Sequence, residues 1–120
     1  MKKLLLLFII PCLLFVISCN DNNYIDTVKY GYFDRCQSGT VGAIVNKYVK
    51  EPSWDTYVAD DGQRVVNLYG KDPNLNYSKI WIQFDIYPNE RWEVYSIEVN
   101  NYIYDEYEIY NFIDKMCLNY

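Results

Sequence analysis

The carboxylates are the side chains of this sequence best suited to acid–base chemistry, because the chain contains no histidine. A Ser-His-Asp triad and a histidine-ligated metal are therefore excluded. Asp60 and Asp61 are adjacent, but Asp61-Gly62 is typical of a hairpin turn, where aspartate is favoured for backbone reasons. The sequence has no Gly-rich phosphate loop and no nucleophile elbow. We therefore predict no catalytic residue and do not expect an enzyme.

A loop around Asp72, Asn74 and Asn76 resembles part of a calcium-binding loop. Pro73 interrupts it, and the turn glycine and the distal glutamate of such a loop are missing. The cysteines have no CxxC spacing either. We predict no metal site.

Aromatic residues flank another carboxylate and suggest a recognition surface. Trp81, Asp85 and Tyr87 share the polar parity of an alternating segment, and Trp92 follows in the next segment. Rigid amphipathic rings are enriched at recognition surfaces. We take Trp81, Asp85, Tyr87 and Trp92 as a candidate binding face, where Asp85 could bind a sugar or a cation. Two ordinary explanations stay open: some of these rings belong to the core, and AT-rich codons favour tyrosine.

The N-terminus has the pattern of an export signal. Lys2 and Lys3 precede an apolar stretch over residues 4–17. As a helix this stretch would span about 21 Å, short of the roughly 30 Å hydrocarbon core of a membrane. The following Val16-Ile17-Ser18-Cys19 resembles a bacterial lipobox. This resemblance implies cleavage before Cys19 and a diacylglyceryl thioether on its sulfur. An ordinary signal peptide with an incidental cysteine, or an uncleaved anchor, is the alternative.

We therefore expect a lipoprotein signal peptide over 1–18, a lipidated polar tether over 19–29 and a single small domain over 30–120. Removing 1–18 takes away two of the 11 basic residues and none of the 16 acidic ones, which leaves a formal charge of -7. That charge does not suit anionic lipid headgroups or nucleic acid. The covalent lipid would hold the protein on the bacterial cell membrane or outer membrane, outside the cytoplasm. We expect no other cofactor.

Two cysteines remain after Cys19 is lipidated. Disulfides persist in exported proteins, so we predict a Cys36–Cys117 bridge. The alternative is two free thiols.

The elements that must position these residues follow from periodicity. Thr40 is a predicted N-cap of a first helix, and Asp105 with Glu108 forms a predicted capping box of a last helix. Four alternating segments between them predict strands over 54–59, 64–69, 79–87 and 91–100. The parity of the fourth segment slips, which predicts a bulge near Tyr95-Ser96. We expect an α+β fold: a meander-like four-stranded antiparallel sheet with both helices on one face.

Short motifs follow one another along this pattern: Thr40-Val41-Gly42, Trp54, Asp61-Gly62-Gln63-Arg64-Val65-Val66-Asn67, Gly70, Ile82-Gln83-Phe84, and Trp92-Glu93-Val94 before Asn100. Together they resemble a module of small bacterial lipoproteins and membrane-tethered envelope proteins. The resemblance covers about residues 28–117. It implies an exported module and no assigned activity.

Taken together, the sequence favours a membrane-anchored binding or interaction module of the cell envelope. Its partner would be another envelope protein, a host protein or a glycan. A small envelope enzyme, an enzyme inhibitor and a structural spacer are the alternatives.

Overall fold

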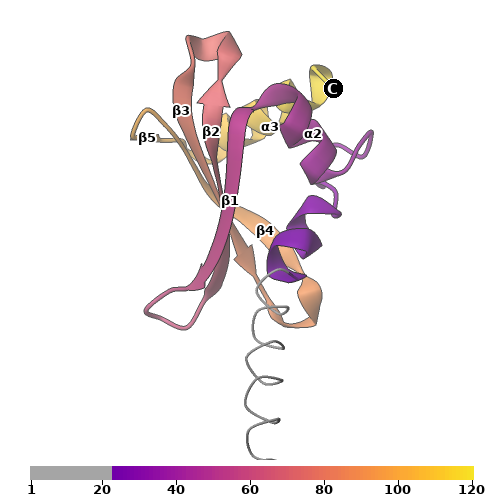
Figure 1. Ribbon diagram of the computed structural model, residues 1–120, viewed down its shortest axis with the longest axis vertical. Helices are drawn as coiled ribbons and strands as arrows, with labels where there is room; N and C mark the ends of the chain where they lie inside the picture. Colours follow the sequence, from indigo (N-terminus) through magenta and orange to yellow (C-terminus); the bar gives the residue numbers. More distant parts are fainter. Residues whose placement is uncertain (1–22) are drawn as a thin grey trace, which may run out of the picture.

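The computed structural model describes residues 23–120, so the predicted signal peptide and Cys19 lie outside the described residues. The described chain forms an α+β fold in which helices cover one face of an antiparallel sheet (Figure 1). The described helices are a segment over 23–29, α2 (Val41–Tyr48) and α3 (Glu106–Leu118). Short 3-10 turns lie at Pro73–Leu75 and Pro88–Glu90. The strands are β1 (Lys50–Val58), β2 (Arg64–Asp72), β3 (Ser78–Ile86), β4 (Trp92–Val99) and β5 (Tyr102–Ile103).

The strands lie side by side in sequence order, β1-β2-β3-β4-β5. The predicted meander is therefore confirmed, but the sheet has five strands rather than four. The additional strand β5 pairs with the end of β4 after a tight turn at Asn100 and Asn101. Both asparagines have positive φ, 50° and 69°, which asparagine tolerates better than most residues. An Asn-Asn step before a two-residue strand was too short a signal to be read as a hairpin.

The hydrophobic core lies between the sheet and the helices. Ile80, Ile82, Phe84 and Ile86 are buried on the face of β3 that meets the helices, as the alternation predicts. From α2 the core receives Val41, Ile44, Val45 and Tyr48. From α3 it receives Phe112, Ile113 and Met116. Both predicted caps are present: the Thr40 side chain accepts from the Ala43 N–H, and Asp105 and Glu108 form a capping box.

The predicted bulge in β4 is confirmed. Gln83 pairs with Ser96 and Phe84 with Val94, so Tyr95 is the extra residue. The extra residue restores a common orientation to the two halves of the strand. Trp92 and Val94 therefore share the core-facing side of β4 with Ile97 and Val99.

The N-terminal segment differs from the expected tether. Residues 23–29 are helical, Val28 is fully buried, and Tyr24 and Ile25 pack against the core. These three residues lie at positions i, i+1 and i+4, which form one face of a helical turn. Polar residues surround these three apolar residues in the sequence, so the stripe is too short to predict a helix. The folded domain therefore includes residues 23–29, which the sequence pattern assigns to the tether.

A disulfide joins Cys36 to Cys117, as predicted, across a sequence separation of 81. It ties the segment before α2 to the C-terminal part of α3. Beside it, Arg35 donates two hydrogen bonds to Asp114, at 3.0 and 2.8 Å.

Within residues 23–120, none of the helices combines the length and the apolar character that crossing a membrane requires.

Candidate binding site

The face of the sheet opposite the core carries no helix in the described part of the chain (Figure 1). Its side chains come from the alternate residues of β1 to β4 and form rows that run across the strands. Three neighbouring rows differ in chemistry: one is polar, one contains two aromatic rings, and one is charged. These rows make up the candidate site.

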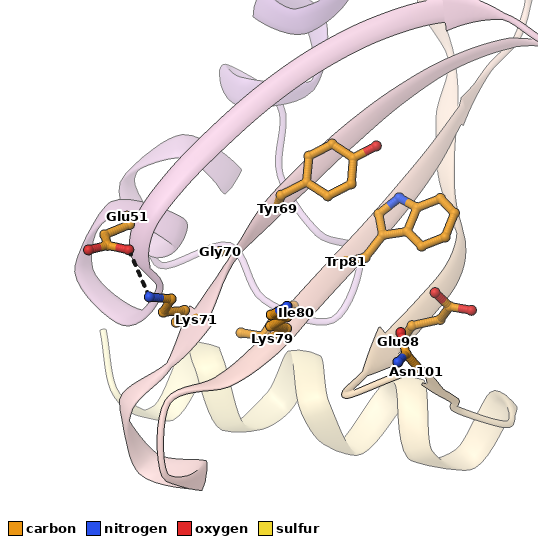
Figure 2. Close-up of a pocket in the computed structure, with 9 residues that line it drawn as sticks. All are labelled: Glu51, Tyr69, Gly70, Lys71, Lys79, Ile80, Trp81, Glu98 and Asn101. Atoms are coloured by element: carbon orange, nitrogen blue, oxygen red, sulfur yellow. Dashed lines mark ion pairs between the residues drawn. The ribbon is translucent and has the colours of Figure 1, made fainter.

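The aromatic row consists of Ser53, Tyr69, Trp81 and Glu98, which are cross-strand partners. The centroids of the Tyr69 and Trp81 rings are 6.0 Å apart, and their planes differ by 22°. Figure 2 shows the two rings beside one another, both seen broadside. Tyr69 is 37% exposed and Trp81 is half-buried. We call these two rings the aromatic platform.

The polar row consists of Asp55, Asn67, Gln83 and Ser96, which are cross-strand partners. It fixes the orientation of the platform. The Trp81 Nε1–H donates a hydrogen bond to Asn67 Oδ1 at 2.9 Å. The Asn67 amide in turn donates from Nδ2 to Asp55 Oδ1, also at 2.9 Å. Asn67 is completely buried, although it lies on the open face, so its amide is shielded from water. Because both of its polar atoms are satisfied, Asn67 holds the indole in one orientation.

The charged row contains Glu51, Lys71 and Lys79 and lies on the other side of the platform. Glu51 Oε2 and Lys71 Nζ form an ion pair at 3.2 Å, drawn as a dashed line in Figure 2. Glu51 has a φ of 53° and lies where the β1 register shifts between Lys50 and Ser53. This bulge at the edge strand brings the Glu51 carboxylate next to Lys71.

A concavity of about 390 Å³ lies over the platform and the charged row. Besides Tyr69, Trp81 and the ion pair, it is lined by Gly70, Lys79, Ile80, Glu98 and Asn101. Figure 2 shows Glu98 and Asn101 beside Trp81, with the ion pair across the strands from them. The site thus combines the faces of two aromatic rings with polar groups at its border.

The Tyr69 hydroxyl keeps its proton at neutral pH. Burial raises the pKa of Tyr69, and the nearby charge of Asp55 raises it further. The hydroxyl is therefore available both as a donor and as an acceptor of hydrogen bonds.

The candidate residues Asp85 and Tyr87 share the open face with Trp81 but lie further along β3 and beyond its end. Asp85 is only 7% exposed and pairs across the strands with Val65 and Glu93. Burial is the main cause that raises its pKa. The Tyr87 hydroxyl donates to Glu93 Oε1 at 2.6 Å. Neither residue lines the concavity over the platform.

The assignment of Trp92 to the binding face is wrong. Trp92 packs on the core side, edge-on to Phe33 and Phe84, with centroid distances of 6.2 and 5.5 Å. The bulge at Tyr95 explains this orientation, because it turns Trp92 and Val94 to the same side as Ile97. Because Ile97 faces the core, a bulge at Tyr95 places Trp92 on the core side as well, and Trp92 cannot then belong to the open face.

Asn67, Glu98 and Asn101 are site residues that sequence reasoning missed. The alternation of β2 indicates that Asn67 lies on the open face, because Asn67 stands between the core residues Val66 and Leu68. The sequence contained no signal that it would be buried, because Asn67 is shielded by its neighbours on an uncovered face. In the described part of the chain, no group of three His, Cys, Asp or Glu side chains could hold a metal ion.

Comparison with protein-family models, with curated proteins and with solved structures found no match to this chain.

Proposed function

We propose that the protein is an exported lipoprotein that binds a ligand, without catalysis, at the aromatic platform on the open face of its sheet. The observation that carries this proposal is the chain of hydrogen bonds from Asp55 through Asn67 to Trp81, which orients an accessible ring in advance. Binding to a preorganised surface loses less conformational entropy. A binding surface benefits from a ring that is held in one orientation, whereas a spacer has no need of it.

Two observations favour binding over catalysis. Among residues 23–120, the carboxylate whose pKa is raised is that of Asp85, which lies away from the concavity, whereas catalytic acids are expected within a pocket. The groups that do border the concavity are a carboxylate–ammonium pair, an amide, a further ammonium and a further carboxylate. These groups provide hydrogen bonds to a ligand.

The proposed anchor rests on the lipobox-like sequence that ends at Cys19, which lies before the described residues. It places the domain outside the cytoplasm on the cell membrane or the outer membrane, in agreement with the disulfide. The unreduced mass of the membrane-extracted protein tests the anchor. We expect the mass of residues 19–120 plus acyl chains, less two hydrogens. The mass of the unprocessed chain would contradict the lipoprotein assignment.

Retention of envelope material on the immobilised mature protein tests the binding function. Delipidated envelope extract is passed over the wild type and over Trp81→Ala, and the retained proteins and sugars are quantified. Tyr107→Ala on α3 is the matched control, because Tyr107 is 73% exposed and does not line the concavity. We expect Trp81→Ala to retain about tenfold less than the wild type and the control. Equal retention by all three proteins would contradict binding at the platform.

A further inference from the structure

We infer that the ligand of the aromatic platform is a neutral carbohydrate, one sugar ring of which lies flat against Tyr69 and Trp81. This inference rests on the proposed binding function and specifies the class of ligand. It derives from the shape of the platform, the arrangement of polar groups around it, the balance of charge and the size of the concavity.

The shape of the platform suits the apolar face of a sugar ring. The planes of the two rings differ by only 22°, so their faces point in nearly the same direction, and Figure 2 shows both rings broadside. The indole N–H already donates to Asn67 and is not available to a ligand. The platform itself therefore offers ring faces, and these attract the C–H groups on one face of a pyranose.

The border of the concavity suits sugar hydroxyl groups, which project from the rim of the same ring. Glu98 and Asn101 lie beside Trp81. Lys79 and the Glu51–Lys71 pair, which form the charged row, line the other part of the concavity. Carboxylates accept hydrogen bonds, ammonium groups donate them, and the asparagine amide does both. A ligand with an apolar face and a polar rim meets both kinds of group at once.

The charges that line the concavity favour a neutral ligand. Glu51 and Glu98 supply two negative charges, and Lys71 and Lys79 supply two positive charges. Their sum is zero, so the site has no net attraction for a polyanion such as nucleic acid or for a cationic peptide.

The size of the concavity favours a small ligand over a protein. Its volume of about 390 Å³ lies at the lower end of the range for small-molecule sites, roughly 300–1,000 Å³. A stable protein interface buries about 800 Å² on each partner, usually around a larger apolar centre. On the open face, the row next to the platform carries polar residues such as Asp55, Gln83 and Ser96.

The test measures binding of neutral trisaccharides to the mature, full-length protein in a detergent without a sugar headgroup. Maltotriose, cellotriose and N,N′,N″-triacetylchitotriose are the soluble probes, and an array of neutral glycans extends the panel. Saturation-transfer NMR reports which sugar protons contact the protein. Trp81 fluorescence reports the site, because Trp54 and Trp92 both pack on the core side of the sheet. We expect at least one probe to bind with a Kd of about 1 mM or tighter.

Three variants locate the binding. Trp81→Ala should weaken it about tenfold, and Trp81→Phe should retain part of it, because a ring remains. Lys79→Ala should weaken it severalfold; its side chain is exposed, so this variant stays informative if Trp81→Ala fails to fold. Tyr57→Ala, on the same face but outside the concavity, should bind as the wild type does.

Three outcomes would overturn the inference. A glycan that binds Trp81→Ala and Lys79→Ala as tightly as the wild type would bind elsewhere. If no glycan binds, but retention of an envelope protein still depends on Trp81, the ligand is not a carbohydrate and the proposed binding function stands. If neither glycan binding nor retention depends on Trp81, the proposed function falls as well.

Discussion

At the scale of single residues, Asn67 links an edge strand to the ring that dominates the open face. Its carbonyl accepts from Trp81 and its amide donates to Asp55, so one side chain connects β1, β2 and β3. Asparagine is depleted in β-strands, and burying an amide without hydrogen-bond partners costs free energy of folding. Its presence here is explained by both hydrogen bonds together.

Replacing Asn67 by leucine removes these hydrogen bonds while nearly preserving side-chain size. The half-buried indole N–H then loses its partner, so we expect the free energy of unfolding to fall by about 1–3 kcal/mol. Urea denaturation measures the change. The control is Asn46→Leu on the exposed side of α2, which should change stability by less than about 0.5 kcal/mol. A similar change in both variants would show that the network has no special role.

Asp85 provides a pH-dependent prediction at the same scale. Burial raises its pKa, so the folded protein binds the Asp85 proton more tightly than the unfolded chain does. This contribution to stability is lost as pH rises from the unfolded pKa of about 3.9 through the raised folded value. We therefore expect Asp85→Asn to be more stable than the wild type at pH 7.

Thermal or urea unfolding at several pH values measures this effect. The gain from Asp85→Asn should shrink in acid, where Asp85 is protonated in both states. Asp60→Asn, in the exposed β1–β2 turn, should give no such gain. Gln83 Nε2 donates a hydrogen bond to Asp85 Oδ1 at 3.5 Å, which opposes the effect of burial. An Asp85→Asn variant that is less stable than the wild type at pH 7 would show that this hydrogen bond outweighs the cost of burying the charge.

The two tryptophans of the candidate face show what sequence reasoning could reach. Trp81 was placed correctly because β3 alternates without interruption, and one parity is apolar from Ile80 to Ile86. Trp92 was placed wrongly because its orientation depends on one extra residue, Tyr95, further along its strand. Parity is reliable within an uninterrupted strand and fails across a bulge, where the local pattern no longer determines the face.

At the scale of elements, the close approach of β1 and β2 depends on Gly70, which borders the candidate site. A Cβ at this position would overlap Val49 Cγ1 and would lie 3.0 Å from the Lys50 carbonyl oxygen. We expect Gly70→Ala to lower the free energy of unfolding by about 1–3 kcal/mol, because the start of β1 must move.

A double-mutant cycle with Val49→Ala checks this cause. The smaller side chain removes the overlap, so the double variant should be less destabilised than the sum of the single variants. Additive effects would indicate that β1 yields without strain, and the packing argument would then be wrong.

The elements missed from the sequence share a physical cause. Strand β5 has only two residues, and the helical segment over 23–29 contributes only three side chains to the core. Elements this short give almost no periodic signal, and tertiary packing rather than intrinsic propensity stabilises them. The longer β2 and β3 and both capped helices were predictable because pattern and caps agreed over many residues.

At the scale of the whole molecule, the disulfide joins two regions that are far apart in sequence. Closing a loop of 81 residues restricts the unfolded chain by about 4–5 kcal/mol in the chain-entropy model. We expect the double variant Cys36→Ser, Cys117→Ser to lose 2–5 kcal/mol of stability, measured by urea denaturation. Reduction of the wild type by dithiothreitol should give a similar loss. A change below about 1 kcal/mol would mean that the Arg35–Asp114 pair and the core hold α3 without it.

The aromatic platform and the first described residues lie near opposite ends of the sheet. Asn23 and Tyr24 lie beside the turn that precedes Arg64, whereas Lys71, at the other end of β2, borders the concavity. The stretch of β2 from Arg64 to Lys71 is about 23 Å long. A molecule fixed through Cys19 would be held near one end of the sheet and carry its binding surface near the other. Many such molecules on one surface would act as a multivalent layer. The avidity of that layer rises with the number of molecules per unit area, even when each single contact is weak.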